Sequence, residues 1–108
     1  MVHERVVSIG PEHPSLAGHF PGYPVVPGVV LLNEVLDTLR RGSSAPLSVT
    51  GLPKVKFSAP LRPGEMVTIR VDEDPGALAT FSCLVDARLI AFGIIEFTTG
   101  TATQAERA

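Results

Sequence analysis

One histidine lies in a stretch of the sequence whose residue types suit proton transfer. His19 belongs to the segment GHFPGYPVVPG over residues 18–28, where recurring prolines and glycines restrict the backbone. A histidine with an ordinary pKa near ~6.5 accepts and returns protons at neutral pH, which makes His19 a candidate general base. The alternative is a loop histidine whose ring is bound only by backbone groups.

The histidine segment leads directly into an apolar stretch with helical spacing. From Gly28 to about Arg41 the valines and leucines recur as they do on the buried face of a helix. Pro27 fits a helix start, where the missing N–H costs little, and the Arg-Arg-Gly sequence at the end fits dipole and capping preferences. The first N–H groups of such a helix have no partner within it, so they are available to a ligand beside His19.

Strand-like segments surround this single helix. Five of them are rich in β-branched or alternating apolar residues and are separated by Gly, Pro and Asp turns; they cover residues 4–9, 47–59, 66–72, 77–85 and 89–98. One helix with about five strands predicts an α+β fold in which an antiparallel sheet wraps around a central helix, the hotdog fold. We expect one domain over residues 1–98 and a disordered tail over residues 99–108, which have little to bury.

Composition excludes several classes of function. The net charge of -2 and the lack of a Lys/Arg run disfavour nucleic-acid binding. The longest apolar run, residues 29–32, is far short of the roughly 20 residues that span a bilayer, and no signal-peptide core follows the N-terminus. The single cysteine, Cys83, cannot form an intramolecular disulfide. A cytoplasmic protein is expected.

Two separated motifs resemble one enzyme family. Residues 19–32 (HFPGYPVVPGVVLL) are similar, without a gap between the histidine and the glycines, to the active-site segment of 3-hydroxyacyl-[acyl-carrier-protein] dehydratases of the FabA/FabZ type. Residues 54–65 (KVKFSAPLRPGE) resemble the strand and turn of the same family, so the similarity spans about residues 4–98. The resemblance implies a hotdog dimer with acyl-binding tunnels at the interface, each site combining the histidine of one subunit with an acidic residue from the helix of the other.

The resemblance also implies a reaction in fatty acid biosynthesis. Members of the family remove water from a 3-hydroxyacyl thioester to give a trans-2-enoyl thioester, without a metal or organic cofactor, and the substrate is carried on the phosphopantetheine of acyl carrier protein or of CoA. In this reading His19 takes the C2 proton and the N–H at Gly28 stabilises charge on the thioester oxygen. The implied substrate-binding residues are Phe20, Pro21, Gly22, Pro27 and Val29.

The sequence departs from the family at its acidic residue. The family has Glu or Asp fourteen positions after the histidine, and this chain has Asn33, an amide that can orient a hydroxyl but cannot donate a proton as an acid does. Glu34 should point about 100° away around the helix. Asp37 lies one turn beyond Asn33 on the same face, where it either supplies the acid or forms an ordinary ion pair with Arg41.

The sequence is therefore compatible with three functions. The chain dehydrates 3-hydroxyacyl thioesters with His19, Asn33 and Asp37; or it is a hotdog thioesterase in which Asn33 positions a water molecule; or it is a non-catalytic subunit that binds acyl carrier protein or pairs with an active paralogue. A homodimer is expected, with a higher oligomer or a heterodimer as alternatives. The longer family members have a further helix and strand before the region that matches Glu4, so we expect a tunnel that is less covered at one end, as suits dehydratases of aryl-polyene-type pathways.

Other reactive residues have simpler explanations. Cys83 shares a strand face with Phe81 and Val85 and is expected to be a small core residue, while His3 and His13 are expected at the surface. No spacing of His, Cys and carboxylate residues forms a metal-ligand set. A basic set forms either a docking patch for an acidic carrier protein or an ordinary solvated surface; it comprises Lys54, Lys56, Arg62, Arg40 and Arg41.

Overall fold

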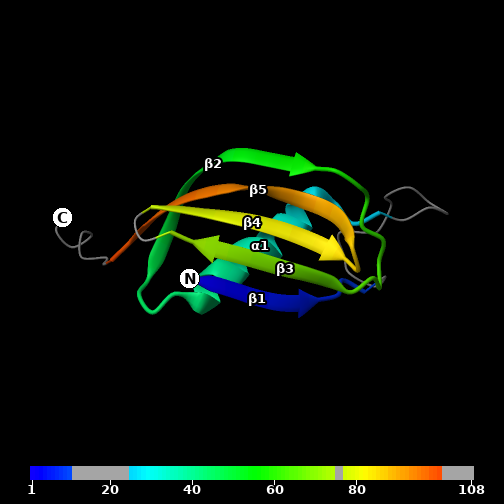
Figure 1. Ribbon diagram of the computed structural model, residues 1–108, viewed down its shortest axis with the longest axis horizontal. Helices are drawn as coiled ribbons and strands as arrows, with labels where there is room; N and C mark the ends of the chain where they lie inside the picture. Colours follow the sequence, from blue (N-terminus) through cyan, green and yellow to red (C-terminus); the bar gives the residue numbers. More distant parts are fainter. Residues whose placement is uncertain (11–24, 75–76, 101–108) are drawn as a thin grey trace.

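One helix lies across one face of a five-stranded antiparallel sheet (Figure 1). The computed structural model describes residues 1–10, 25–74 and 77–100. The elements are β1 (Val2–Val7), α1 (Gly28–Gly42), β2 (Leu47–Phe57), β3 (Val67–Glu73), β4 (Leu78–Val85) and β5 (Arg88–Thr99). Within these described residues, no helix is long and apolar enough to cross a membrane. The α+β architecture predicted from the sequence is confirmed.

The strand order places β1 and β2 at opposite edges of the sheet. The order is β1-β3-β4-β5-β2, and every neighbouring pair is antiparallel. Alternation in β3 turns Val67, Ile69 and Val71 towards the helix, and all three are completely buried. The helix contributes Val35 and Leu39, which are likewise fully buried. This shared apolar layer fixes α1 on the sheet, and thereby fixes where its N-terminus lies.

All five strands differ from the sequence prediction by one or two residues at one or both ends. β1 starts at Val2 and ends at Val7 instead of running over residues 4–9, because it pairs from Val2↔Asp72 to Val7↔Val67 and β3 begins at Val67. β5 continues through Thr99, and the Gly100 N–H donates to the Pro46 carbonyl at 3.0 Å. The fold thus extends beyond residue 98. Of the tail predicted over residues 99–108, Thr99 belongs to β5 and Gly100 is bonded next to it, while residues 101–108 lie outside the described residues.

The C-terminal end of α1 lies against a histidine and has no glycine cap. Gly42 is the last helical residue and does not have the positive φ of a glycine cap; the Ser43 N–H donates to the Arg40 carbonyl at 3.2 Å. A side chain at Gly42 would collide with the imidazole ring of His3. His3 is half-buried there with Nε2 3.4 Å from a carboxylate oxygen of Glu73, so the expectation that it is a surface residue was wrong.

Gly93 in β5 provides a stability test of the sheet. A Cβ at Gly93 would lie 2.1 Å from the carbonyl oxygen of Lys54 in β2 and 2.8 Å from the Phe81 ring. Because a backbone atom cannot move aside, Gly93→Ala should lower the free energy of unfolding by about 3 kcal/mol. Urea denaturation measures this change. Gly51→Ala is the matched control in the same strand pair, since its Cβ would meet only the flexible Glu96 carboxylate at 3.0 Å, and it should cost less than about 1 kcal/mol. Equal losses in the two variants would contradict the tight β2–β5 contact.

Candidate active site

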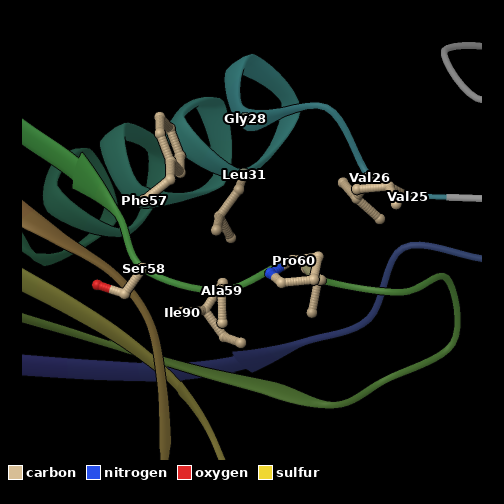
Figure 2. A pocket seen from close by; sticks show the side chains of 10 residues that line it. Val25, Val26, Gly28, Leu31, Phe57, Ser58, Ala59, Pro60 and Ile90 are labelled. Atoms are coloured by element: carbon tan, nitrogen blue, oxygen red, sulfur yellow. The ribbon is translucent and has the colours of Figure 1, made fainter.

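An apolar cavity of about 430 Å³ opens at the N-terminal end of α1 (Figure 2). Its lining comes from the segment before the helix, the first turn of the helix, the end of β2 with the loop after it, and β5; the residues are Val25, Val26, Gly28, Leu31, Phe57, Ser58, Ala59, Pro60, Leu61 and Ile90. Serine is the only side chain among these that carries a polar group. The cavity therefore suits an apolar chain, with polar chemistry confined to its helix end.

The helix end supplies backbone donors. Pro27 precedes the helix in an extended conformation (φ -60°, ψ 142°), and its side chain provides no cap. Its carbonyl accepts from Val30 at 3.0 Å and Leu31 at 3.4 Å, which are the first hydrogen bonds of the helix. The N–H groups of Gly28 and Val29 come before this ladder and carry the partial positive charge of the helix N-terminus. A carbonyl oxygen that gains negative charge would be stabilised there.

Gly28 is crowded by an aromatic ring. A Cβ at Gly28 would lie 2.6 Å from Cζ of Phe57, and Figure 2 shows that ring beside the first turns of α1. Phe57 is the last residue of β2 and is 48% exposed. The absence of a side chain at Gly28 thus leaves space for the Phe57 ring, and not only for a substrate that approaches the helix. Phe57 was not among the site residues that sequence reasoning selected.

Backbone hydrogen bonds join the remaining parts of the cavity. The N–H groups of Ser58 and Ala59 donate to the Ile90 carbonyl at 2.8 and 3.4 Å. The Leu61 carbonyl accepts from the Val26 N–H at 2.8 Å. The sequence marked residues 54–65 as a family motif, yet nothing in it showed that this motif faces the helix N-terminus. The antiparallel register, with Phe57 opposite Ala91, brings them together.

The predicted site residues separate into four groups. Gly28 lines the cavity. Pro27 and Val29 flank it without lining it, and Val29 is 62% exposed. Asn33 is exposed on the next turn of the helix, outside the cavity. His19, with residues 20–22, lies outside the described residues.

The acidic residues of α1 face β1 and are held by arginines. Asp37 Oδ2 accepts from Arg41 Nε at 2.8 Å and from Arg5 Nη1 at 3.2 Å, and Arg5 also pairs with Glu34. The hydrogen bond from Arg41, helped by the charges of both arginines, holds the pKa of Asp37 below its usual 3.8 despite some desolvation. Asp37 is thus ionised at neutral pH and forms the ion pair with Arg41 that the spacing predicted. Glu34 points away from Asn33's exposed face, as the helical geometry predicted.

Other candidate reactive groups are structural. Cys83 is buried in the core, as predicted, and burial raises the pKa of its thiol to about 12, so it is not a nucleophile at neutral pH. Lys54 lies over the Phe92 ring at 5.3 Å, on the face of the sheet opposite the helix. Across the described ranges, no three His, Cys, Asp or Glu side chains are arranged to hold a metal ion.

Comparisons with known proteins agree with this geometry. The sequence profile of the ApeI-like family, described as ApeI dehydratase, matches residues 3–93. The 3-hydroxyacyl-[acyl-carrier-protein] dehydratase FabZ of Chlamydia trachomatis serovar L2 is 31% identical over 101 residues, which cover 80% of this chain and 65% of the relative. FabZ of Syntrophobacter fumaroxidans is 26% identical over 109 residues, covering 90% of this chain and 74% of the relative.

Solved structures give the same result. The dehydratase heterocomplex ApeI:P from Xenorhabdus doucetiae matches with a TM-score of 0.78 and 28% identity, over 88% of this chain and 87% of that one. The fluoroacetyl-CoA-specific thioesterase FlK matches with a TM-score of 0.73 over 97% and 96% of the two chains, but at 14% identity it shows the fold alone.

The fold and these matches define a hotdog-fold protein of the FabA/FabZ-like dehydratase class. Within that class, the chain belongs to the ApeI-like family. It spans about two thirds of the Chlamydia relative, 65% of that protein's length. The family resemblance inferred from the two sequence motifs is confirmed.

The contact between Gly28 and Phe57 can be measured by a double-mutant cycle. Gly28→Ala places a methyl group against the ring, and because a half-exposed ring can turn aside, the free energy of unfolding should fall by only about 1 kcal/mol. In a Phe57→Ala background the same substitution should cost nothing, which gives a coupling energy of about 1 kcal/mol in urea denaturation. Additive effects of the two changes would contradict the contact.

The Asp37 pair predicts a specific titration. Carbon-13 NMR of the Asp37 carboxyl should show a midpoint below 3.8, and Arg41→Ala should move it upward because Arg41 is the largest cause of the depression. Since the folded pKa is depressed, the stabilisation from this pair is present above the unfolded pKa and is lost as the pH falls through the folded value. Arg40→Ala is the control, because Arg40 acts on Asp37 only by its charge and should shift the midpoint less. A midpoint unaffected by Arg41→Ala would contradict the assignment.

Proposed function

We propose that this protein removes water from 3-hydroxyacyl thioesters to give trans-2-enoyl thioesters. The observation that supports this most directly is the apolar cavity that ends at the free N–H groups of α1 in a chain of the ApeI-like family. An acyl chain fits the cavity, and the thioester carbonyl then lies near Gly28. The acyl group is carried on the pantetheine arm of acyl carrier protein or of CoA, and no metal or organic cofactor takes part in the proposed steps.

His19 acts as the base and returns the proton. Its imidazole takes a proton from C2, and the electron pair of that C–H bond moves onto the thioester to give an enolate, which then forms the C2–C3 double bond as the C3–O bond breaks. The leaving hydroxyl receives the proton from the imidazolium and departs as water. Negative charge on the thioester oxygen is stabilised by the N–H of Gly28. This assignment needs no carboxylic acid, which agrees with the ionised state of Asp37.

Asn33 orients the departing hydroxyl in the cavity of a partner subunit. Five residues separate Gly28 from Asn33, which corresponds to about 140° of rotation around a helix, so the two residues face different directions. Asn33 is exposed and lies outside the cavity of its own chain. An amide that reaches into a second chain's cavity binds the substrate hydroxyl without exchanging protons with it.

The edge strand β2 supports a dimer. Among the described residues, β2 is paired only on the side of β5. Exposed apolar residues lie on β2 and on α1: Leu52 at 40%, Phe57 at 48% and Val29 at 62%. An unpaired, partly apolar edge of 11 residues is a template for pairing with another chain. We propose a homodimer; a heterodimer with a paralogue is the alternative, since the related ApeI:P dehydratase is a heterocomplex.

A thioesterase is the second candidate, and one observation favours it. The residue at the family's acidic position is an amide, Asn33, which is able to position a water molecule for attack on a thioester carbonyl. Hydrolysis would release a free thiol, whereas dehydration leaves the thioester intact. The two reactions are therefore separated by their products.

Product analysis tests the proposed reaction. The purified protein is incubated with 3-hydroxyacyl, 2-enoyl and saturated acyl thioesters, and enoyl product, hydrated product and free thiol are measured separately. We expect enoyl formation and its reverse, and a fall of at least about 100-fold in His19→Ala, because loss of a general base typically costs that much. His13→Ala, a histidine change in the same proline-rich stretch, is the matched control and should keep the wild-type rate.

Two further variants test which residue gives the proton to the departing hydroxyl. Asp37→Asn should leave the rate of dehydration within about twofold, since a carboxylate already paired with two arginines is not the acid in the proposed steps. Asn33→Ala should lower kcat. A large loss in Asp37→Asn would instead make Asp37 the acid; thiol release without enoyl product would favour the thioesterase, and binding without turnover would indicate a non-catalytic subunit.

A further inference from the structure

One wall of the cavity ends in a turn with a fixed shape. Residues 58–65, in the loop between β2 and β3, are called the pocket wall, because the first four of them line the cavity. It closes with a turn in which the Glu65 N–H donates to the Arg62 carbonyl at 3.2 Å and Gly64 has a φ of 88°. Proline before a glycine of positive φ is the favoured sequence for a type II turn. The proline and this hydrogen bond restrict the conformations of the turn, and they restrict where its last residue lies relative to the wall.

The carboxylate of Glu65 accepts two hydrogen bonds, one from the turn itself and one from β5. Oε1 accepts from the backbone N–H of Arg62 at 2.8 Å, and Oε2 accepts from Arg88 Nη2 at 2.6 Å. Arg88 is the first residue of β5, and it follows the tight turn at Asp86, which has a φ of 55°. The hydrogen bond from the Arg62 N–H and the charge of Arg88 outweigh desolvation and lower the pKa of Glu65, so its carboxylate is ionised at neutral pH.

The pocket wall is bonded in turn to the segment before the helix. The Leu61 carbonyl accepts from the Val26 N–H at 2.8 Å, and the Gly64 N–H donates to the Ile9 carbonyl at 2.9 Å. Val26 is buried and stands two residues before Gly28. A shift of the turn at Glu65 would therefore displace both the apolar lining and the start of α1.

We propose that Glu65 is a positioning residue that, through Arg88, fixes the pocket wall against the N-terminus of α1 and thereby sets affinity for the acyl chain. This role rests on the proposed function, in that the cavity binds an acyl thioester. A second glutamate–arginine pair, Glu4 with Arg70 at 2.9 Å, joins β1 to β3 away from the cavity and provides a comparison.

Binding and amide exchange test the proposal together. The probes are pantetheine thioethers of short and long 2-oxoalkyl chains, which keep a carbonyl but cannot be hydrolysed. By calorimetry, Glu65→Gln and Arg88→Gln should each weaken binding of the long-chain probe about fivefold, and the double variant no further, because both remove the same ion pair. Glu4→Gln is the matched control and should bind as the wild type does. Hydrogen exchange at the Val26 amide, followed by NMR, should speed up in Glu65→Gln and not in Glu4→Gln.

The outcomes separate this proposal from the proposed function. If Glu65→Gln lowers the melting temperature as Glu4→Gln does, but leaves probe affinity and Val26 exchange unchanged, the residue has only a structural role and the proposal is overturned. If the wild type binds no probe, the assignment of acyl thioesters as substrates fails. In that case the role of Glu65 is tested by hydrogen exchange at the Val26 amide alone. Faster exchange in Glu65→Gln supports the positioning role of Glu65, and unchanged exchange refutes it.

Discussion

The site depends on one close packing contact, between the first turn of α1 and the end of β2. The N-terminus of the helix carries backbone N–H groups that have no partner within the helix. These groups form a binding site only where neighbouring segments enclose a cavity in front of them. Here the ring of Phe57 lies against Gly28 and the Leu61 carbonyl holds the Val26 N–H. Two segments about thirty residues apart are thereby joined into one cavity.

This contact is itself a consequence of the sheet. β2 reaches the helix N-terminus because it pairs with β5 in a register that places Phe57 opposite Ala91. Gly93 allows that pairing by leaving space for the Lys54 carbonyl. The buried residues of β3 then hold α1 on the same sheet. The position of the site is therefore a property of the whole domain, and a backbone clash distant from the cavity would disturb it.

Much of this was predictable from local patterns, and the failures have physical causes. The helix at Gly28 followed from apolar spacing, and the strands from alternation, because both are set by the burial of one face. The ion pair of Asp37 with Arg41 followed from helical geometry alone. Phe57 and the pocket wall were missed as site residues, although their motif was recognised, since only the register of β2 on β5 brings them to the helix. His3 was misplaced for the same reason: its burial depends on Gly42, far along the chain.

The carboxylates of α1 are paired with arginines of the same chain, which leaves the polar chemistry of the cavity to other groups. Both carboxylates of the helix turn towards β1 and are neutralised by Arg5 and Arg41, so neither contributes to the cavity. Asn33 is polar without being acidic; it is exposed and is not among the residues that line its own chain's cavity. A partly exposed network of paired charges and an exposed amide thus lie on neighbouring parts of the helix surface. Since β2 is an edge strand in the described part of the chain, one chain presents both a template for association and an exposed amide, as the proposed dimer requires.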